Sequence, residues 1–371
     1  TSDGPPGPEW QPFDSEGARD RSATQPGAKS CGSREAERPR VRTPRLARRV
    51  VPRLAEGPDA DLSSTLSGWY RFAPYRHFRL LPKSAQTALV QRAIERILRT
   101  PDAFAVTGGK RHTAAVAIGR PLTWDSRYFG VPMGRLDYLI QAPDATRSDV
   151  RAALSLALDQ FRALRIRHVA VKLDVEDGEA LACLQEHGFR LMDSTLTYVA
   201  HPRRDAPRAL RCLGQVRPFD VSDIEQILDI TREAYAGYQG RFFRDHHLPR
   251  VRAEAFYVEW ARQCCSGGMA DRILVAEGTG GRLLGWASVK WADTEAVLGR
   301  SRISKGSLGA CRPDVPGAYA GIIAELARDN HSAGALTEAQ TQNTNVAMIR
   351  LLESLGAQYV RGDYDLHAWL D

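Results

Sequence analysis

The sequence predicts an α/β fold built from two tandem halves, each a mixed β-sheet flanked by helices. From about Trp69 onward, stretches with apolar residues at helical spacing alternate with short β-like runs. The segment ALACLQEHGFRLMDSTLTYVA, from Ala180, aligns with MIRLLESLGAQYVRGDYDLHAWL, from Met348, and each predicts a helix, a glycine turn and a strand. In the second half, a strand also runs through a glycine-containing turn into a helix.

Two changes in composition divide the chain. Residues 1–55 are rich in Pro, Gly, Ser, Arg and Glu and lack a periodic apolar pattern. Such a segment cannot bury enough surface to offset the entropy of ordering, so we expect a disordered tail. A polar stretch rich in Pro and Arg, His201–Arg211, is typical of a linker. We therefore place the first folded half at residues 56–204 and the second at residues 205–371.

The first half should begin with a helix over Ala85–Arg99, because its apolar residues share one helical face. The β-like runs Phe104–Val106 and Thr113–Ile118 are separated by Gly108-Gly109-Lys110, which predicts a hairpin. Further along we expect a helix over Arg147–Arg165, a strand over His168–Leu173, a short helix that ends at Gly188, and a strand through Thr195, Thr197 and Val199.

The second half should begin with a strand over Val216–Phe219 and an amphipathic helix over Val221–Tyr235. The later turn Arg312–Gly317 lies between a strand and a helix, where backbone N–H groups and the positive helix end point at whatever lies beyond. A pyrophosphate fits there, although an ordinary loop has the same pattern. The intervening elements expected are a helix over Arg250–Cys264, strands over Arg272–Glu277, Leu283–Trp291 and Gly306–Cys311, and a helix over Ile322–Asp329.

The composition is that of a globular protein, with 43% hydrophobic and 26% charged residues. No apolar stretch approaches the roughly 20 residues that span a bilayer, and no signal pattern opens the chain, so we expect a cytoplasmic protein without a membrane partner. The net charge is +7, but much of the basic clustering lies in Arg34–Arg53, which lacks interleaved aromatic residues. We therefore do not expect a nucleic-acid partner. The six cysteines form no CxxC pair, so no structural metal site is expected.

The order of elements and the segment Thr341–Ala357 resemble the GNAT superfamily of N-acetyltransferases. In that superfamily an Asn opens the helix after the fifth strand, and Asn345 matches it. A closer resemblance, over about residues 70–371, is to the TDP-4-amino-sugar N-acetyltransferases of the TDP-fucosamine type. It rests on Trp124–Gly130 (WDSRYFG), His187–Asp193 (HGFRLMD), Arg241–Phe243, Phe256–Trp260, Asp271–Glu277, His367 and Trp369.

This resemblance implies transfer of an acetyl group from the cosubstrate acetyl-CoA to the amine of a nucleotide-linked amino-deoxy sugar, and it allows a homodimer. The first half would be a degenerate GNAT-like domain that supports the acceptor site and binds no CoA. Such a reaction needs a deprotonated amine near the thioester and fixed N–H donors for the oxyanion, which the strand Gly306–Cys311 would supply. The CoA-binding residues implied are Leu308, Gly309, Ala310, Pro316, Gly317, Ala318, Tyr319, Ala320, Gly321 and Asn345.

The resemblance places the acceptor at the loop Tyr235–Arg250. Arg241 and Arg244 could pair with a diphosphate through their planar guanidinium groups, or could simply be solvated surface residues. Trp291 is a third expected substrate contact. Candidates for the base that takes the amine proton are His246 and His247, and Asp293 and Glu295 acting through a water.

Two positions depart from the family pattern. Tyr319 stands where the phosphate loop has a Gly, and Pro316 removes one N–H donor. Many family members carry a Tyr seven residues after the Asn, as the acid that protonates the leaving thiolate, and this position is Leu352 here. Tyr364, Tyr359 and Tyr319 are candidates to replace it. The alternatives are an N-acyltransferase for another amine, such as an aminoglycoside, an amino acid or a peptide, and an inactive GNAT-like binding or scaffold protein.

Overall fold

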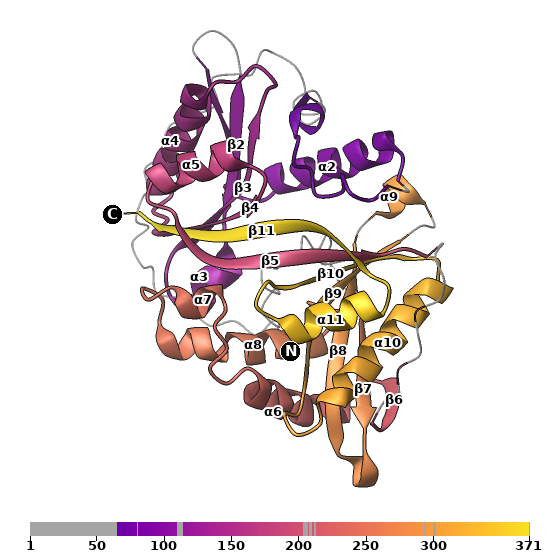
Figure 1. Ribbon diagram of the computed structural model, residues 1–371. Helices are drawn as coiled ribbons and strands as arrows, with labels where there is room; N and C mark the ends of the chain where they lie inside the picture. The colour runs from indigo at the N-terminus through magenta and orange to yellow at the C-terminus, as the bar shows by residue number, and fades with distance from the viewer. Residues whose placement is uncertain are drawn as a thin grey trace, which may run out of the picture.

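A computed structural model describes residues 65–79, 81–109, 114–202, 207, 210, 213–292, 294–299 and 302–370. The expected disordered tail lies outside these ranges, as does much of the expected linker. The described chain forms an 11-stranded mixed sheet flanked by helices, with the order β1-β2-β3-β4-β11-β5-β10-β9-β8-β7-β6 (Figure 1). The prediction of an α/β fold in two tandem halves is therefore confirmed. None of the helices in the described ranges combines the length and apolar character needed to cross a membrane.

The first half contains the expected elements and two that were not predicted, a short helix over Thr123–Phe129 and a strand over Met133–Gln141. That strand carries Arg135 and Asp137, which form an ion pair with each other at 3.3 Å. Asp137 also pairs with Arg120 of the neighbouring strand, at 3.0 Å. The elements are α2 (Lys83–Leu98), β1 (Phe104–Gly108), β2 (Ala115–Pro121), α3 (Thr123–Phe129), β3 (Met133–Gln141), α4 (Arg147–Ala163), β4 (His168–Asp174), α5 (Gly178–Glu186) and β5 (Arg190–Ala200).

The second half also follows the expected order. Its α10 begins at Pro316 rather than near Ile322, because proline is well suited to the first turn of a helix. The elements are β6 (Gln215–Pro218), η1 (Val221–Asp223), α6 (Ile224–Ala234), α7 (Arg241–Arg244), α8 (Arg250–Cys265), β7 (Arg272–Glu277), η2 (Thr279–Gly281), β8 (Leu283–Trp291), α9 (Glu295–Leu298), β9 (Ile303–Cys311), α10 (Pro316–Ser332), β10 (Leu336–Gln342), α11 (Val346–Ser354) and β11 (Gln358–Trp369).

The two halves are structural copies of one unit. The starts of β1 and β7, Phe104 and Arg272, are 168 residues apart (272 − 104), and β2 and β8, β4 and β10, and β5 and β11 start with the same separation. The helices α5 and α11 each span 9 residues and are followed by a left-handed glycine, with φ of 84° at Gly188 and 83° at Gly356. The repeat seen in the sequence is therefore a repeat of the fold.

The halves exchange their last strands. Strand β5 of the first half pairs with β10 of the second, and β11 of the second half pairs with β4 of the first. The two exchanged strands pair with each other, and they lie side by side across the middle of the molecule (Figure 1). Each half therefore completes the sheet of the other. As a result, Asp193 and Thr195 of β5 line a cavity together with residues of β9 and β10.

Candidate active site

A cavity of about 330 Å³ lies where β9 and β10 separate. The two strands pair in parallel only from Ile303 to Lys305 on β9, and then diverge. The last residues of both strands line the gap, and tyrosines of α8, of α10 and of the segment that follows α6 cover part of it. Further lining residues are Asp193 and Thr195 of β5 and Lys172 of β4, so both halves contribute.

One backbone amide of β9 points into this gap. The Leu308 N–H donates to Ser288 Oγ on β8, at 3.0 Å, and Ser288 Oγ in turn donates to the Leu308 carbonyl, at 2.7 Å. Because successive peptide groups of a strand point to opposite sides, the N–H of Gly309 is directed away from β8 and toward the gap. The Tyr235 hydroxyl reaches the Gly309 carbonyl at 3.1 Å, on the same side.

Residue 309 must be glycine for steric reasons. A Cβ atom there would lie 2.7 Å from the Trp286 carbonyl oxygen and 2.8 Å from the Tyr319 ring. The close packing of β8 and of Tyr319 against Gly309 leaves the cavity floor as bare backbone. A floor of this kind allows a ligand to approach the amide closely.

The implied CoA-binding residues fall into two groups. Leu308, Gly309, Ala310, Tyr319 and Asn345 line the cavity. Asn345 is the N-cap of α11, where its Oδ1 accepts a hydrogen bond from the Met348 N–H at 3.1 Å. The other residues lie in the first two turns of α10 and do not line this cavity; they are Pro316, Gly317, Ala318, Ala320 and Gly321.

Asp193 supplies a buried carboxylate to the cavity. Its side chain accepts hydrogen bonds from the Gln342 amide and, at 2.9 Å, from the Ser194 N–H. Burial raises the pKa of this carboxyl above its usual range, and the negative charge of Asp365 adds to the effect. Asp365 is the direct cross-strand neighbour of Asp193 on β11. The Asp193 carboxyl group in the cavity thus lies next to a second carboxyl group, which the other half contributes.

The two arginines of α7 lie in different surroundings. Arg241 is buried, lines the cavity, and approaches Asp365 to 3.8 Å. Burial lowers the pKa of its guanidinium, and the nearby carboxylates oppose this effect. Arg244 lies at the other end of α7, where it donates to the Met192 carbonyl at 3.1 Å and lines a second cavity.

Trp291, the third expected substrate contact, lines neither cavity, and the guanidinium of Arg302 lies 5.6 Å from its ring. Glu295, at the start of α9, also lines neither cavity. Asp293 lies outside the described residues.

Of the tyrosines expected as acids, only Tyr319 lines the cavity, and burial raises its pKa. Tyr359 is 51% exposed and packs against Tyr198, whereas Tyr364 packs against the core of the first half. Leu352 is buried. Three further tyrosines line the cavity and were not predicted from the sequence, namely Tyr235, Tyr238 and Tyr257. Two of them lie in the loop that was expected to hold the acceptor.

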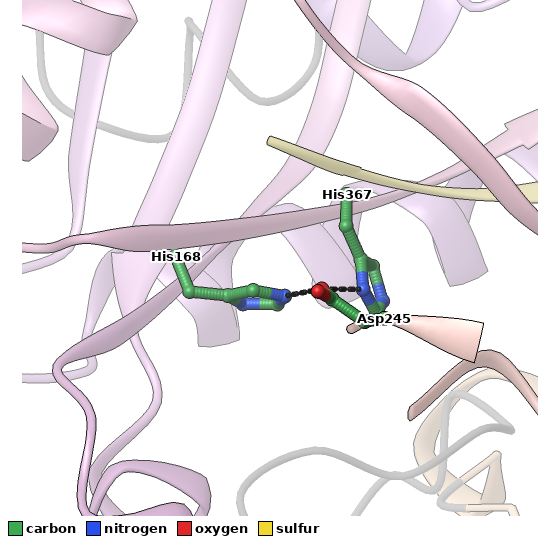
Figure 2. Close-up of side chains that lie close together, drawn as sticks. All are labelled: His168, Asp245 and His367. Carbon is green, nitrogen blue, oxygen red and sulfur yellow. Dashed lines mark hydrogen bonds and ion pairs between the residues drawn. The ribbon is translucent and has the colours of Figure 1, made fainter. Parts of the chain in front are cut away.

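A buried polar cluster of His168, Asp245 and His367 is shown in Figure 2. It adjoins the second cavity, which has a volume of about 320 Å³. Asp245 Oδ2 lies 2.8 Å from His367 Nδ1 and 3.3 Å from His168 Nε2. The indole N–H of Trp369 donates to both oxygens of the same carboxylate, at 3.1 Å. Burial raises the pKa of Asp245, but the hydrogen bonds and charges of His168 and His367 outweigh this effect and hold the pKa far below its usual value. Burial lowers the pKa of His168 to about 4. The sequence resemblance included His367 and Trp369, but only the tertiary structure brings Asp245 between them.

Comparisons with known proteins agree with this architecture. No protein-family model matches the chain. The spore coat polysaccharide biosynthesis protein SpsD of Bacillus subtilis (strain 168) is 26% identical over 209 residues, which are 54% of this chain and 66% of that protein. The chain thus matches slightly less than two thirds of the length of this curated relative.

Two solved structures show the fold. A GCN5-related N-acetyltransferase from Sphaerobacter thermophilus has a TM-score of 0.54 and 12% identity, with 84% of this chain and 93% of that chain covered. The GCN5-related glucosamine N-acetyltransferase region of a fungal multi-domain GH3 β-N-acetylglucosaminidase has a TM-score of 0.55 and 11% identity, with 84% of this chain and 37% of that chain covered. The chain therefore has the fold of the GCN5-related N-acetyltransferases, in two tandem copies.

Proposed function

We propose that this protein is an N-acyltransferase that moves an acetyl group from acetyl-CoA to the amine of a sugar-like acceptor, in the cavity between β9 and β10. The observation that carries the proposal is the arrangement of a bare backbone amide at Gly309 opposite a buried carboxylate at Asp193, within one cavity. An acyl transfer to an amine needs these two groups, an N–H donor for the oxyanion and a base for the amine proton.

The cavity fits the acyl-CoA thioester. The β9 side of the gap presents the bare backbone of Gly309, and Tyr319, which also lines the cavity, lies in the first turns of α10, near the positive end of that helix. We assign the thioester end to Leu308, Gly309 and Ala310, and the pantetheine arm to Asn345. The phosphates then belong at the first turns of α10, from Pro316 to Gly321. Acetyl-CoA would supply the activated acyl group and a thiolate leaving group.

Asp193 is proposed as the base. A protonated amine must lose a proton before it attacks, and a carboxylate with a raised pKa accepts that proton more readily than an ordinary one. The Gln342 amide orients the carboxylate, and Arg244 lies 3.8 Å from its Oδ1. The buried guanidinium of Arg241 offsets the negative charges of Asp193 and Asp365.

Tyr319 is proposed as the group that protonates the departing thiolate. It is the one expected acid among Tyr319, Tyr359 and Tyr364 that lines the cavity, and its ring lies against Gly309. A CoA thiol resembles cysteine in acidity, with a pKa near about 8.5, so the thiolate can leave with little help. We therefore expect Tyr319→Phe to slow turnover without abolishing it.

The acceptor end of the cavity is polar. Lys172 donates to Gln340 at 2.6 Å, and both line the cavity beside Asp193. The Thr195 hydroxyl, also a lining group, is buried without a hydrogen-bond partner among the described residues. Such groups favour a hydroxylated acceptor over an apolar amine. An amino sugar, in nucleotide-linked form, is consistent with them, with the sequence resemblance, and with the polysaccharide-biosynthesis name of the curated relative.

The test is CoA-thiol release from acetyl-CoA with a TDP-4-amino sugar and with glucosamine as acceptors. Asp193→Asn should lower kcat by about 10²–10⁴ and remove the corresponding rise from the pH profile, with little change in CoA affinity. Asp229→Asn is the matched control, because Asp229 is exposed on α6, lines neither cavity and forms an ion pair with the neighbouring Arg232. Full activity of Asp193→Asn would place the base elsewhere.

The scaffold alternative makes the opposite prediction. The missing tyrosine at Leu352 favours it, because family members use that position for the acid. Absence of both CoA binding and thiol release with every amine, including an aminoglycoside, amino acids and a peptide, would establish this alternative. Release with one of those amines but not with amino sugars would instead establish a different acceptor.

A further inference from the structure

The second cavity is lined by two arginines, Arg190 and Arg244, and by His246 and His247. Among the described residues that line it, Asp245 is the sole carboxylate. That carboxylate already accepts hydrogen bonds from the Trp369 indole, from His367 Nδ1 and from the His247 N–H. It therefore has little capacity to pair with the arginines, and the cavity presents an excess of donors to any ligand.

Two of the side chains that line the cavity, those of Arg190 and His246, make no hydrogen bond or ion pair in the described part of the chain. Arg244 bonds to the Met192 carbonyl through one nitrogen, and the guanidinium group has further donors. An anion with several oxygens, such as a phosphate, could accept from both arginines at once.

The deep end of the cavity offers a different group. His367 is 1% exposed, and its Nε2 atom is buried without a hydrogen-bond partner among the described residues. Because Nδ1 is bonded to Asp245, the ring is held in place and Nε2 is left as its bonding atom. Beside it, Trp369 supplies a flat apolar surface that also lines the cavity. This combination suits a hydroxylated ring.

The same residues have the composition of a metal site, since His168, Asp245 and His367 each offer a ligand atom. The geometry favours a hydrogen-bonded cluster instead. Asp245 Oδ2 is within direct hydrogen-bonding distance of His367 Nδ1, and the Trp369 indole N–H donates to both carboxylate oxygens of Asp245. A cation between them would have to displace these donors.

The two cavities adjoin each other at α7. Arg241 at the start of this helix lines the first cavity, and Arg244 at its end lines the second. Arg244 Nη1 also lies 3.8 Å from Asp193 Oδ1, the carboxylate proposed as the base. A ligand group bound by Arg244 is thus next to the site of proton transfer.

We propose that the second cavity binds the phosphate group and an attached hydroxylated ring of the acceptor, with the phosphate on Arg190 and Arg244 and the ring against His367 and Trp369. The identification of the ligand as the acceptor rests on the proposed function, whereas the phosphate site itself does not. The shared chemistry is a phosphorylated, hydroxylated ring, which a sugar phosphate and a nucleoside diphosphate both contain.

The experiment measures binding to the full chain in the absence of CoA, by calorimetry, with inorganic pyrophosphate, glucosamine 1-phosphate and thymidine diphosphate as probes. Arg190→Ala and Arg244→Ala should each weaken the binding of all three probes by about tenfold or more, and added salt should weaken it further. Arg151→Ala is the matched control, since Arg151 is an exposed arginine of α4 that lines neither cavity.

A second variant tests the deep end of the cavity. His367→Phe should weaken glucosamine 1-phosphate and thymidine diphosphate but leave pyrophosphate unchanged, because only the first two carry a ring. Far-UV circular dichroism and the Tm establish that the variant is folded; if it is not, His367→Gln replaces it. A stronger effect on thymidine diphosphate than on glucosamine 1-phosphate identifies the nucleoside as the bound ring, and the reverse identifies the sugar.

The outcomes separate this inference from the proposed function. Weakened phosphate binding in the arginine variants, in a protein that never releases CoA thiol, would support the site and remove the enzyme assignment. Unchanged probe binding in Arg190→Ala and Arg244→Ala would overturn the site, even in an active enzyme. Stoichiometric Zn²⁺ binding that is lost in His367→Gln would also overturn it, in favour of a metal centre.

Discussion

The helix cap at Asp177 provides a sharp test of how the two halves differ. Asp177 is the N-cap of α5, where its Oδ1 accepts from the Ala180 N–H at 3.1 Å. The matching residue of the second half, Asn345, makes the same bond at the start of α11. Asp177 is 4% exposed, and burial raises its pKa from 3.8 to about 6, whereas Asn345 is exposed and neutral. We predict that Asp177→Asn stabilises the protein.

The magnitude follows from the pKa. The folded pKa of Asp177 lies above the unfolded one, so its protonation favours the folded state, and this contribution is lost as the pH rises through about 6. Above that pH the buried charge costs up to ~3 kcal/mol. Asparagine keeps the cap without the charge, and loses only a charge–dipole interaction of about 0.3–1 kcal/mol. The expected gain at pH 8 is therefore about 2 kcal/mol.

The assay is urea denaturation of the parent and of Asp177→Asn at pH 8 and at pH 4. The gain should appear at pH 8 and should be absent at pH 4, where Asp177 is protonated in the folded state. The control is Asn345→Asp, which places a charge at the exposed cap and should change stability by no more than about 1 kcal/mol. A loss of stability at pH 8, or a gain that does not depend on pH, would refute the reasoning.

Three further predictions concern the site and the strand exchange. The folded pKa of His168 is about 4 and the unfolded value is 6.5, so the unfolded chain gains this proton first as the pH falls. The parent should therefore lose about 3 kcal/mol of stability between pH 6.5 and pH 4. In His168→Gln, the free energy of unfolding measured by denaturation should fall less steeply over the same pH range. Gly309→Ala should lose about 1–3 kcal/mol by overpacking, whereas Gly306→Ala, whose added Cβ meets its nearest atoms at 3.8 Å, should cost less in the same measurement. Residues 205–371 expressed alone should aggregate in light-scattering measurements, because the sheet lacks β5 between β10 and β11; a monomeric, cooperatively unfolding fragment would contradict this.

The sequence by itself was sufficient for the local elements and for their order. Helices such as α2 and α4 follow from apolar residues on one helical face, and the left-handed glycines Gly188 and Gly356 mark where α5 and α11 end. The repeat between the halves was also visible, because the helix, the glycine and the strand recur at a fixed separation. Strand β3 was missed, although its residues Arg135 to Tyr138 alternate between polar and apolar as those of a strand do.

The tertiary structure decided which strands pair, and with them the composition of the site. Pairing between distant strands depends on backbone hydrogen bonds and on sheet closure, and neither has a signature in the residue order. The exchange of β5 and β11 brings Asp193 beside Asp365 and carries it into a cavity built mostly by the second half. The pairing of β11 with β4 likewise brings His168 and His367 to Asp245. In the sequence, Asp245 is 77 residues (245 − 168) from His168 and 122 residues (367 − 245) from His367. The local sequence pattern thus predicted most of the helices and strands. The positions of the charged groups depended on long-range strand pairing, because their burial and their neighbouring charges exist only once the sheet has formed.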